Sequence, residues 1–402
     1  MNTNISKLFF AVAILFAVLP SCRKQDDIYK EYVKVGGYVY PAKPIEESYT
    51  QGYKRVILHW TRPLDPAVKS AKVFWENYTY SMDVDYSKFP DGKVSVSIED
   101  LEERTYSFDI VNYDSSNHAS LATEVTAAPY GDFWLSSNSE RTLLSARMME
   151  DKDSAMVVMS KSTYLMTSTK FSYVDNQNKT VELEELLLPD KDTVYLPHPM
   201  KGKKFSFSSA FCPVDGADTV YNRWTKTASG VEYKLDVSGW KVTVTKNQTQ
   251  STNTVDKIFD GIYNSTSKRW QSTTNATYRK VFPKIITVDT GTAPGAEYSF
   301  SSLDFYQHPT TKGSRWIKNV FVYVTDEPLN PDTTESYEEL LGEPYWKSTF
   351  VQDQAVTTMS LVNAPRSGRY FSIIFTNSYS SSNYLDLWEL MPYGCLASEM
   401  AD

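Results

Sequence analysis

The sequence predicts an all-β protein built from several small sandwiches in series. Short runs of alternating apolar and polar residues recur along the chain, and long stretches with helical periodicity are nearly absent. Turn-forming residues, β-branched residues and tyrosine dominate, with 28 Tyr in 402 residues. At ~150 residues per domain, this length corresponds to two or three domains.

The first residues, 1–21, have the features of a secretory signal peptide. Lys7 precedes an apolar run, 8–19, that is too short to cross a hydrocarbon core of ~30 Å as a helix. The segment Leu19-Pro-Ser-Cys22 resembles a bacterial lipobox. That resemblance implies cleavage before Cys22 and lipidation of its thiol and amine. An ordinary signal peptide with an incidental cysteine is the alternative.

Residues 22–32 are predicted to be a lipid-anchored tether. The acidic pair Asp26-Asp27 follows the lipobox closely, as in the surface-export signal of Bacteroidetes-type lipoproteins, although a solvated tether would look the same. Acyl chains contribute ~0.8 kcal/mol per buried CH₂, so several chains on one cysteine hold a protein firmly to a membrane. We therefore expect an outer-membrane lipoprotein exposed on the cell surface.

Residues 33–128 are predicted to form the first sandwich. The expected strands alternate apolar and polar residues, and they cover 55–60, 71–75, 93–98, 101–110 and 120–126. Leu101 lies five residues before Tyr106, which resembles the tyrosine corner of immunoglobulin and fibronectin type III sandwiches and implies that the Tyr106 hydroxyl fixes the preceding loop. The run from Tyr29 to Pro41 also resembles the start of an uncharacterised Bacteroidetes lipoprotein domain.

Residues 130–228 are predicted to form a second fibronectin-like sandwich. Short β-type runs recur at sandwich spacing, at 155–159, 170–174, 180–183, 193–196 and 204–211. The polar segment 226–230 is then the expected linker to the third domain. In this interpretation the first two sandwiches are spacers that carry the third.

Residues 230–395 carry a family resemblance, and 396–402 are the expected C-terminal tail. Five segments in order resemble the discoidin-like domain, also called the coagulation factor 5/8 type C domain, whose group includes carbohydrate-binding module family 32. These segments are 257–270, 282–291, 315–325, 369–375 and 385–394. The resemblance implies a jelly-roll β-sandwich that binds ligands on loops at one end and has no catalytic machinery.

The same resemblance places a glycan site on the loops 246–254, 263–278, 305–315 and 377–384. Flat aromatic rings take the C–H face of a sugar, and polar side chains bind its hydroxyl groups. The candidate residues are Tyr306, His308, Lys312, Arg315, Asn377, Tyr379, Asn383 and Tyr384. Exposed loop residues without a ligand are the alternative. Trp270, Trp316 and Trp388 lie inside strand-like runs and are expected in the core.

Many discoidin-like domains bind a structural Ca²⁺ between an Asp-Gly turn and a glutamate near the C-terminus, since oxygen ligands suit this hard cation. The matching residues are Asp260, Asn264, Thr266 and Glu389. The turn departs from the pattern because Ile262 stands where an oxygen-bearing side chain is usual. A hydrogen-bonded or salt-bridged Glu389 without metal is the alternative.

Several classes of function are disfavoured. The net charge of −8 argues against nucleic acid, which requires a surplus of Lys and Arg. The four histidines have no metal-ligand spacing, and no Cys-x-x-Cys, Gly-x-Ser-x-Gly or phosphate-binding glycine loop occurs. We therefore do not expect an enzyme, although paired carboxylates depend on the fold. Cys212 and Cys395 are expected to be free thiols, with a bridge as the alternative.

The sequence thus predicts a surface lipoprotein whose terminal module binds a glycan or polysaccharide and supports a neighbouring uptake complex. A non-enzymatic adhesin or structural lipoprotein, whose loops contact a protein partner, is the alternative.

Overall fold

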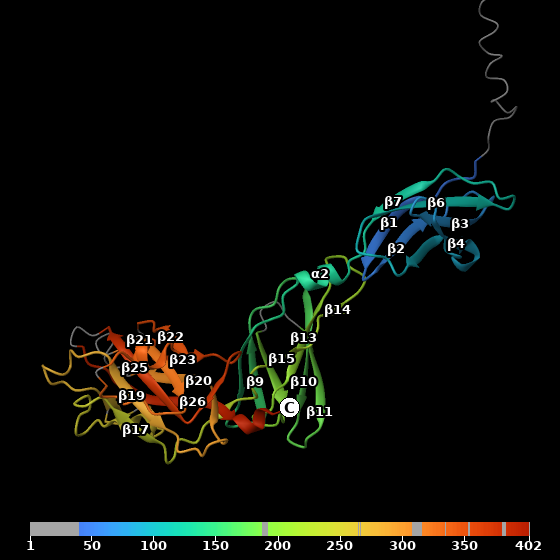
Figure 1. Cartoon of the computed structure of the whole chain (residues 1–402). Coiled ribbons are helices and arrows are strands. Elements are labelled where there is room, and N and C mark those ends of the chain that lie inside the picture. The colour runs from blue at the N-terminus through green and yellow to red at the C-terminus, as the bar shows by residue number, and fades with distance from the viewer. Residues whose placement is uncertain are drawn as a thin grey trace, which may run out of the picture. The chain divides into compact units, whose positions relative to one another are not determined.

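The structure is a computed structural model that describes residues 40–186, 192–263, 265, 267–307, 316–333, 335–352, 354–379 and 383–401 (Figure 1). It divides into two compact units, residues 1–132 and 133–402. The described elements are mostly antiparallel strands with a few helices of three to six residues, so the predicted all-β class is confirmed. Among the described residues, none of the helices has the length and apolar character to cross a membrane.

The first unit is a sandwich of a three-stranded and a four-stranded sheet, with strand orders β1-β2-β5 and β4-β3-β6-β7. Its elements are β1 (Ile45–Gly52), β2 (Arg55–Thr61), β3 (Val68–Trp75), β4 (Tyr80–Asp85), η1 (Tyr86–Lys88), β5 (Lys93–Ile98), β6 (Tyr106–Asp114) and β7 (Thr123–Ala127). In β5, Val94 and Ile98 are buried, as the alternating pattern predicts.

The tyrosine corner of the first unit is confirmed. Tyr106 opens β6, its side chain is buried, and its hydroxyl accepts a hydrogen bond of 3.1 Å from the backbone N–H of Glu102. Because Leu101 is also buried in the same core cluster, the loop before β6 is held at both ends.

The second unit begins with another pair of antiparallel sheets, shown in green in Figure 1. One sheet has the order β12-β9-β8, and the other has the order β11-β10-β13 with β14 and β15 along β13. The elements are α2 (Asp132–Ser137), β8 (Leu143–Met148), β9 (Ser154–Met159), β10 (Met166–Val174), β11 (Thr180–Leu186), β12 (Thr193–Pro197), β13 (Ser206–Phe211), β14 (Val220–Tyr221) and β15 (Thr225–Lys226).

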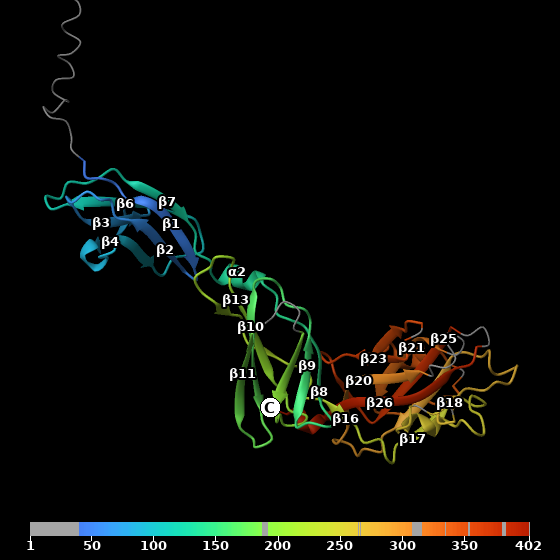
Figure 2. The same cartoon turned by 180° about the vertical axis from the view of Figure 1, so that it is seen from behind.

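The C-terminal sandwich packs the sheet β16-β26-β20-β23, with β18 and β24 at its margins, against the sheet β17-β19-β25-β21-β22 (Figure 2). The first sheet comprises β16 (Tyr233–Lys234), β18 (Trp270–Gln271), β20 (Tyr298–Gln307), β23 (Val356–Ser360), β24 (Arg366–Gly368) and β26 (Asp386–Leu396). The second comprises β17 (Lys241–Val244), β19 (Lys284–Asp289), β21 (Ile317–Thr325), β22 (Trp346–Thr349) and β25 (Tyr370–Ser378). Short helices are η2 (Val255–Phe259), α3 (Tyr337–Leu341) and η4 (Ala397–Met400).

The core of this sandwich explains where two expected loops begin. β20 continues to Gln307 because Phe305 is fully buried and the Gln307 side chain accepts the N–H of Ile317 at 2.8 Å. β25 likewise extends through Ser378. The first residues of the predicted loops 305–315 and 377–384 are therefore strand residues. The predicted core positions of Trp270, Trp316 and Trp388 are confirmed, with 0%, 2% and 8% exposure.

The segment expected to be a linker is instead packed between the second and the C-terminal sandwich. Thr227 and Ser229 are buried, and a Cβ atom on Gly230 would lie 1.7 Å from the carbonyl oxygen of Gly202. The backbone N–H of Val231 donates to the carbonyl of Lys203, and the carbonyl of Val231 accepts the N–H of Gly202, both at 2.9 Å. The chain therefore passes from one sandwich to the next without a free segment.

A buried ion network ties the same two sandwiches together. Arg147 of β8 donates to Glu232 at 3.1 Å and to Asp304 of β20 at 2.9 Å, and its guanidinium lies 3.9 Å from the ring centroid of Tyr393. Glu232 and Asp304 are both buried. The expected tail is fixed as well, because Glu399 accepts the Tyr233 hydroxyl at 2.8 Å.

Cys212 and Cys395 are free thiols, as predicted, and Cys395 is buried in the C-terminal sandwich. Burial raises the pKa of the Cys395 thiol to about 12, so it stays protonated at neutral pH.

Candidate functional site

Two tyrosines from distant parts of the chain meet on the outer face of the six-stranded sheet. Along β20, Leu303 and Phe305 point into the core, so Tyr306 points away from it. Its ring lies against Tyr263, with centroids 4.8 Å apart and planes inclined by 38°. Tyr306 is half-buried and Tyr263 is 46% exposed, so an aromatic surface faces solvent here. We call this pair the aromatic platform.

A tight turn positions Tyr263. The helix η2 buries Ile258 and is followed by Asp260, whose carboxylate accepts the N–H of Ile262 at 2.9 Å. Gly261 follows with φ = 74°, a left-handed conformation that glycine adopts without steric cost. Its N–H donates to both carboxylate oxygens of Glu389 at 3.2 Å, which fixes the turn on β26.

Glu389 lies directly beside the platform because it is the cross-strand partner of Tyr306. Its side chain is buried, and this burial raises the pKa of the carboxyl group to about 8. The N–H of Gly261 opposes the rise, and the charge of Asp260 adds to it. The platform is thus bordered by a carboxyl group that is held in a single position.

Two of the four predicted Ca²⁺ ligands can be compared with the structure. Asp260 and Glu389 flank the Gly261 turn, whereas Asn264 and Thr266 lie outside the described residues. The described residues contain no group of three or more His, Cys, Asp or Glu side chains that could hold a metal ion. The two oxygen-bearing groups that are described have the donor type that Ca²⁺ requires.

The predicted glycan-binding residues are divided between two sheets. His308, Lys312 and Arg315 lie outside the described residues. Tyr379 follows β25, and its hydroxyl donates to the carbonyl of Phe350 at 2.8 Å. Tyr306 lies on β20 in the other sheet and has Tyr263 as its ring partner.

The remaining polar candidates surround the end of β25. Asn377 is exposed, and its side-chain oxygen accepts the N–H of Ser378 at 2.8 Å. Asn383 is half-buried with φ = 59°, and Tyr384 is half-buried. Lys318 lies 5.4 Å from the ring centroid of Tyr379 and adds a cation to this group.

Sequence reasoning missed Tyr263 as a member of the site. It marked only the start of the predicted loop 263–278. The signal in the sequence was a tyrosine two residues after an Asp-Gly turn, but its partner Tyr306 is far away along the chain. Only the register of β20 against β26 shows that the two rings meet.

Comparison with known proteins gives one family match. Residues 22–219, slightly less than half of the chain, match a family model described as a domain of unknown function. No curated protein matches the sequence.

Several solved structures are similar to parts of the chain. The C-terminal domain of a chitobiase from Bacteroides fragilis has 15% identity and a TM-score of 0.30, covering 41% of this chain and 99% of that one. A SusE-like protein has 12% identity and a TM-score of 0.31, covering 87% and 97%. A family 32 carbohydrate-binding module from a glycoside hydrolase of Clostridium perfringens has 14% identity and a TM-score of 0.29, covering 40% and 94%.

Proposed function

We propose that this chain binds glycan through its C-terminal sandwich. The observation that carries the proposal is the aromatic platform, in which a partly exposed pair of rings adjoins the fixed carboxyl group of Glu389. Sugars present apolar C–H faces together with hydroxyl edges. Rings that face solvent beside polar groups match both parts of such a ligand.

Tyr306 belongs to the predicted loop 305–315, whose polar residues would complete the binding surface. In this proposal Tyr263 and Tyr306 take the face of one sugar unit. Hydroxyl groups are then bound by polar side chains of the two predicted loops, namely His308, Lys312, Arg315, Asn377, Tyr379, Asn383 and Tyr384. The discoidin-like resemblance of the sequence supports this arrangement.

The proposed location is the outer membrane, with the protein anchored through Cys22 and exposed on the cell surface. The lipobox-like segment Leu19-Pro-Ser-Cys22 and the acidic pair behind it support this location. A glycan-binding module at that surface would capture polysaccharide for a neighbouring uptake complex. Metabolic labelling with palmitate tests the anchor, and a Cys22→Ala variant that is still labelled would contradict it.

We also propose a structural Ca²⁺ at the Gly261 turn, held by Asp260 and Glu389 together with Asn264 and Thr266. It would neutralise the two carboxylates and hold the platform turn on β26. Titration with CaCl₂ should raise the melting temperature of the protein and should leave a Glu389→Gln variant unchanged. An equal rise in both proteins would refute the site.

The test of glycan binding is a glycan array followed by calorimetric titration of the best ligand. Tyr263→Ala and Tyr306→Ala should each weaken binding by about tenfold or more, because each removes a ring from contact with the sugar and a loss of about 1.4 kcal/mol is tenfold in affinity. Tyr195→Ala is the matched control, since Tyr195 is 52% exposed in the second sandwich.

Two outcomes would decide against the proposal. Unchanged affinity in both platform variants would remove the platform from the site. An array without any glycan ligand, combined with a protein partner recovered by pull-down through the same loops, would favour the adhesin alternative.

A further inference from the structure

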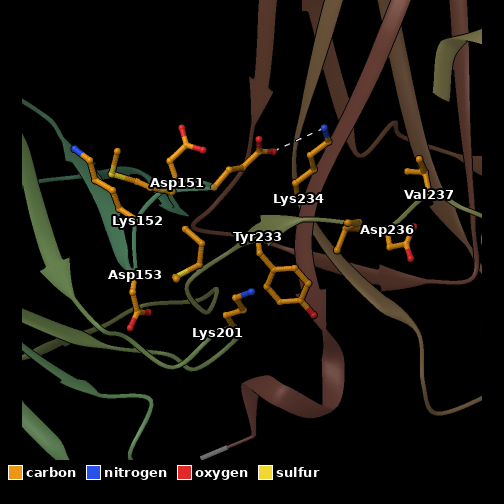
Figure 3. A pocket seen from close by; sticks show the side chains of 12 residues that line it. Asp151, Lys152, Asp153, Lys201, Tyr233, Lys234, Asp236 and Val237 are labelled. Carbon is orange, nitrogen blue, oxygen red and sulfur yellow. Dashed lines mark ion pairs between the residues drawn. The ribbon is translucent and has the colours of Figure 1, made fainter. Parts of the chain in front are cut away.

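A hollow lies where the second sandwich meets the C-terminal sandwich. It is lined by the turn 148–153 between β8 and β9, by Lys201 and by residues 233–237, and Figure 3 shows these side chains. We call it the junction pocket. Its volume of about 760 Å³ lies within the range of about 300–1,000 Å³ that is usual for ligand sites.

The lining combines an apolar part with charges of both signs. Met148, Met149, Tyr233, Leu235 and Val237 form the apolar part. The charged part consists of three lysines and four acidic residues, which are Lys152, Lys201, Lys234, Glu150, Asp151, Asp153 and Asp236. Ammonium groups donate hydrogen bonds and carboxylates accept them, so the pocket offers both functions to a ligand.

This balance of charge selects a class of ligand. A hydroxyl group both donates and accepts, and a chain of neutral sugars carries many of them next to apolar C–H faces. A polyanion would meet four carboxylates against three ammonium groups, which gives no net attraction. The pocket therefore matches a neutral oligosaccharide better than an acidic polymer.

The walls are fixed before any ligand arrives. The backbone N–H of Met148 donates to the carbonyl of Glu232, and the N–H of Glu232 donates to the carbonyl of Ala146, both at 2.8 Å. Tyr233 pairs with Gly394 of β26, and its hydroxyl donates to Glu399, which orients the ring. A site that is already ordered loses less entropy when it binds.

Charged side chains of the pocket act on Tyr306 of the aromatic platform and on Glu389 beside it. Glu150 and Lys234 line the pocket and form an ion pair, with 3.8 Å between the Lys234 Nζ and a Glu150 carboxylate oxygen, and a dashed line marks this pair in Figure 3. The pKa of Tyr306 is raised by burial and also by nearby charges that include Glu150. Burial raises the pKa of Glu389, and Lys234 opposes that rise. Tyr306 of the platform and Glu389 beside it therefore lie within electrostatic reach of Glu150 and Lys234, which we call the pocket margin.

We infer that the junction pocket is a second sugar subsite, which takes further units of a neutral polysaccharide whose neighbouring unit lies on the aromatic platform. This inference rests on the proposed glycan binding. It adds that the bound glycan is several sugar units long and uncharged. The chain would cross the margin at Glu150 and Lys234. Both sandwiches of the second unit would then contribute to one extended site.

The experiment compares neutral galacto-oligosaccharides of increasing length, from mono- to hexasaccharide, by calorimetric titration. Binding should strengthen as the chain becomes long enough to enter the pocket. A Lys152→Ala/Lys201→Ala variant should bind the monosaccharide like the unchanged protein and the hexasaccharide about tenfold more weakly, as expected for one or two lost hydrogen bonds. Both lysines are exposed, so the variant should keep its melting temperature.

Lys161→Ala is the matched control, because Lys161 is exposed in the second sandwich and does not line the pocket. A gain in affinity with length that persists in the double variant would overturn the inference and leave the proposed function intact. Equal affinity for the monosaccharide and for all longer oligosaccharides would also overturn the inference and leave the proposed function intact. Failure of every length to bind would overturn this inference, and failure of the whole glycan array would overturn the proposed function with it.

Discussion

Lys284, on β19, is a charged side chain inside the C-terminal sandwich. It is fully buried, and its ammonium group donates to the Gln248 side chain at 3.0 Å and to the carbonyls of Arg279 and Val281 at 3.1 and 2.8 Å. Three acceptors match the three N–H groups of an ammonium ion. The side chain therefore ties the segment before β19 to the loop that carries Gln248.

The burial of Lys284 makes stability depend on pH. It lowers the pKa of the ammonium group from 10.5 to about 8 in the folded protein. Between these two values the unfolded chain binds more protons than the folded one, so the free energy of unfolding should rise as pH rises through this window. At ~1.4 kcal/mol per unit, the contribution reaches roughly 3 kcal/mol.

Urea unfolding of the protein and of a Lys284→Met variant across this pH window tests the effect. Other titrating groups act on both proteins, and unsatisfied carbonyls in the variant add a constant offset. The difference in unfolding free energy should therefore grow with pH in favour of the unchanged protein. A difference that stays constant would show that Lys284 titrates normally.

Single residues could be predicted from sequence when their partners are close along the chain. The Tyr106 corner is an example, because Glu102 lies four residues away and the pattern is local. Tyr263 and Lys284 are counterexamples. Their roles depend on Tyr306 and Gln248, which only strand pairing brings near.

Among the elements, β20 shows why a central strand escaped prediction. The strand Tyr298–Gln307 has a register shift between Phe300 and Ser302. Phe300 and Leu303 both face the core although they are three residues apart, so the alternation with period two is interrupted. The strands β2 and β5 keep that alternation, and they were predicted within one residue.

The segment between the second and the C-terminal sandwich gives a prediction at this scale. Gly230→Ala should destabilise the second unit by about 3 kcal/mol or more, at or above the upper end for overpacking, since a methyl group has no space beside the Gly202 carbonyl. Gly291→Ala is the control, because its surroundings are open and only its φ of 72° opposes the change. That conformation should cost about 1–2 kcal/mol or less.

Urea unfolding followed by intrinsic fluorescence measures both variants. Limited proteolysis should also cut the Gly230→Ala protein near residues 226–231 earlier than the control. Equal unfolding free energy and equal resistance to proteolysis in the two variants would mean that this segment accommodates the methyl group without loss of packing, as a linker would.

For the whole molecule, the sequence predicted independent spacers carrying a separate module. The structure instead places residues 133–402 in one compact unit. The contacts responsible join Arg147 to Glu232 and Asp304, residues that are 85 and 157 positions away. No local pattern marks such a network, because each residue by itself has the composition of a solvated strand face. The junction pocket escaped notice for the same reason.

We therefore predict that Arg147 determines whether the two sandwiches of the second unit unfold together. Its replacement by Ala leaves the carboxylates of Glu232 and Asp304 buried without their cation, and losing one partner of a buried pair costs about 3–5 kcal/mol. Arg147→Lys should recover only part of this, because an ammonium group cannot fork between two carboxylates. Two separate unfolding transitions should replace the single transition of residues 133–402.

Differential scanning calorimetry of the full chain resolves these transitions. Arg104→Ala is the control, since Arg104 is 48% exposed in its pairs with Glu76 and Glu102, and exposed ion pairs contribute little to stability. If the junction pocket and the aromatic platform form one extended sugar site, Arg147→Ala should weaken hexasaccharide binding more than monosaccharide binding. A single undisturbed transition with unchanged length dependence would mean that the two sandwiches are held together by their apolar contacts alone.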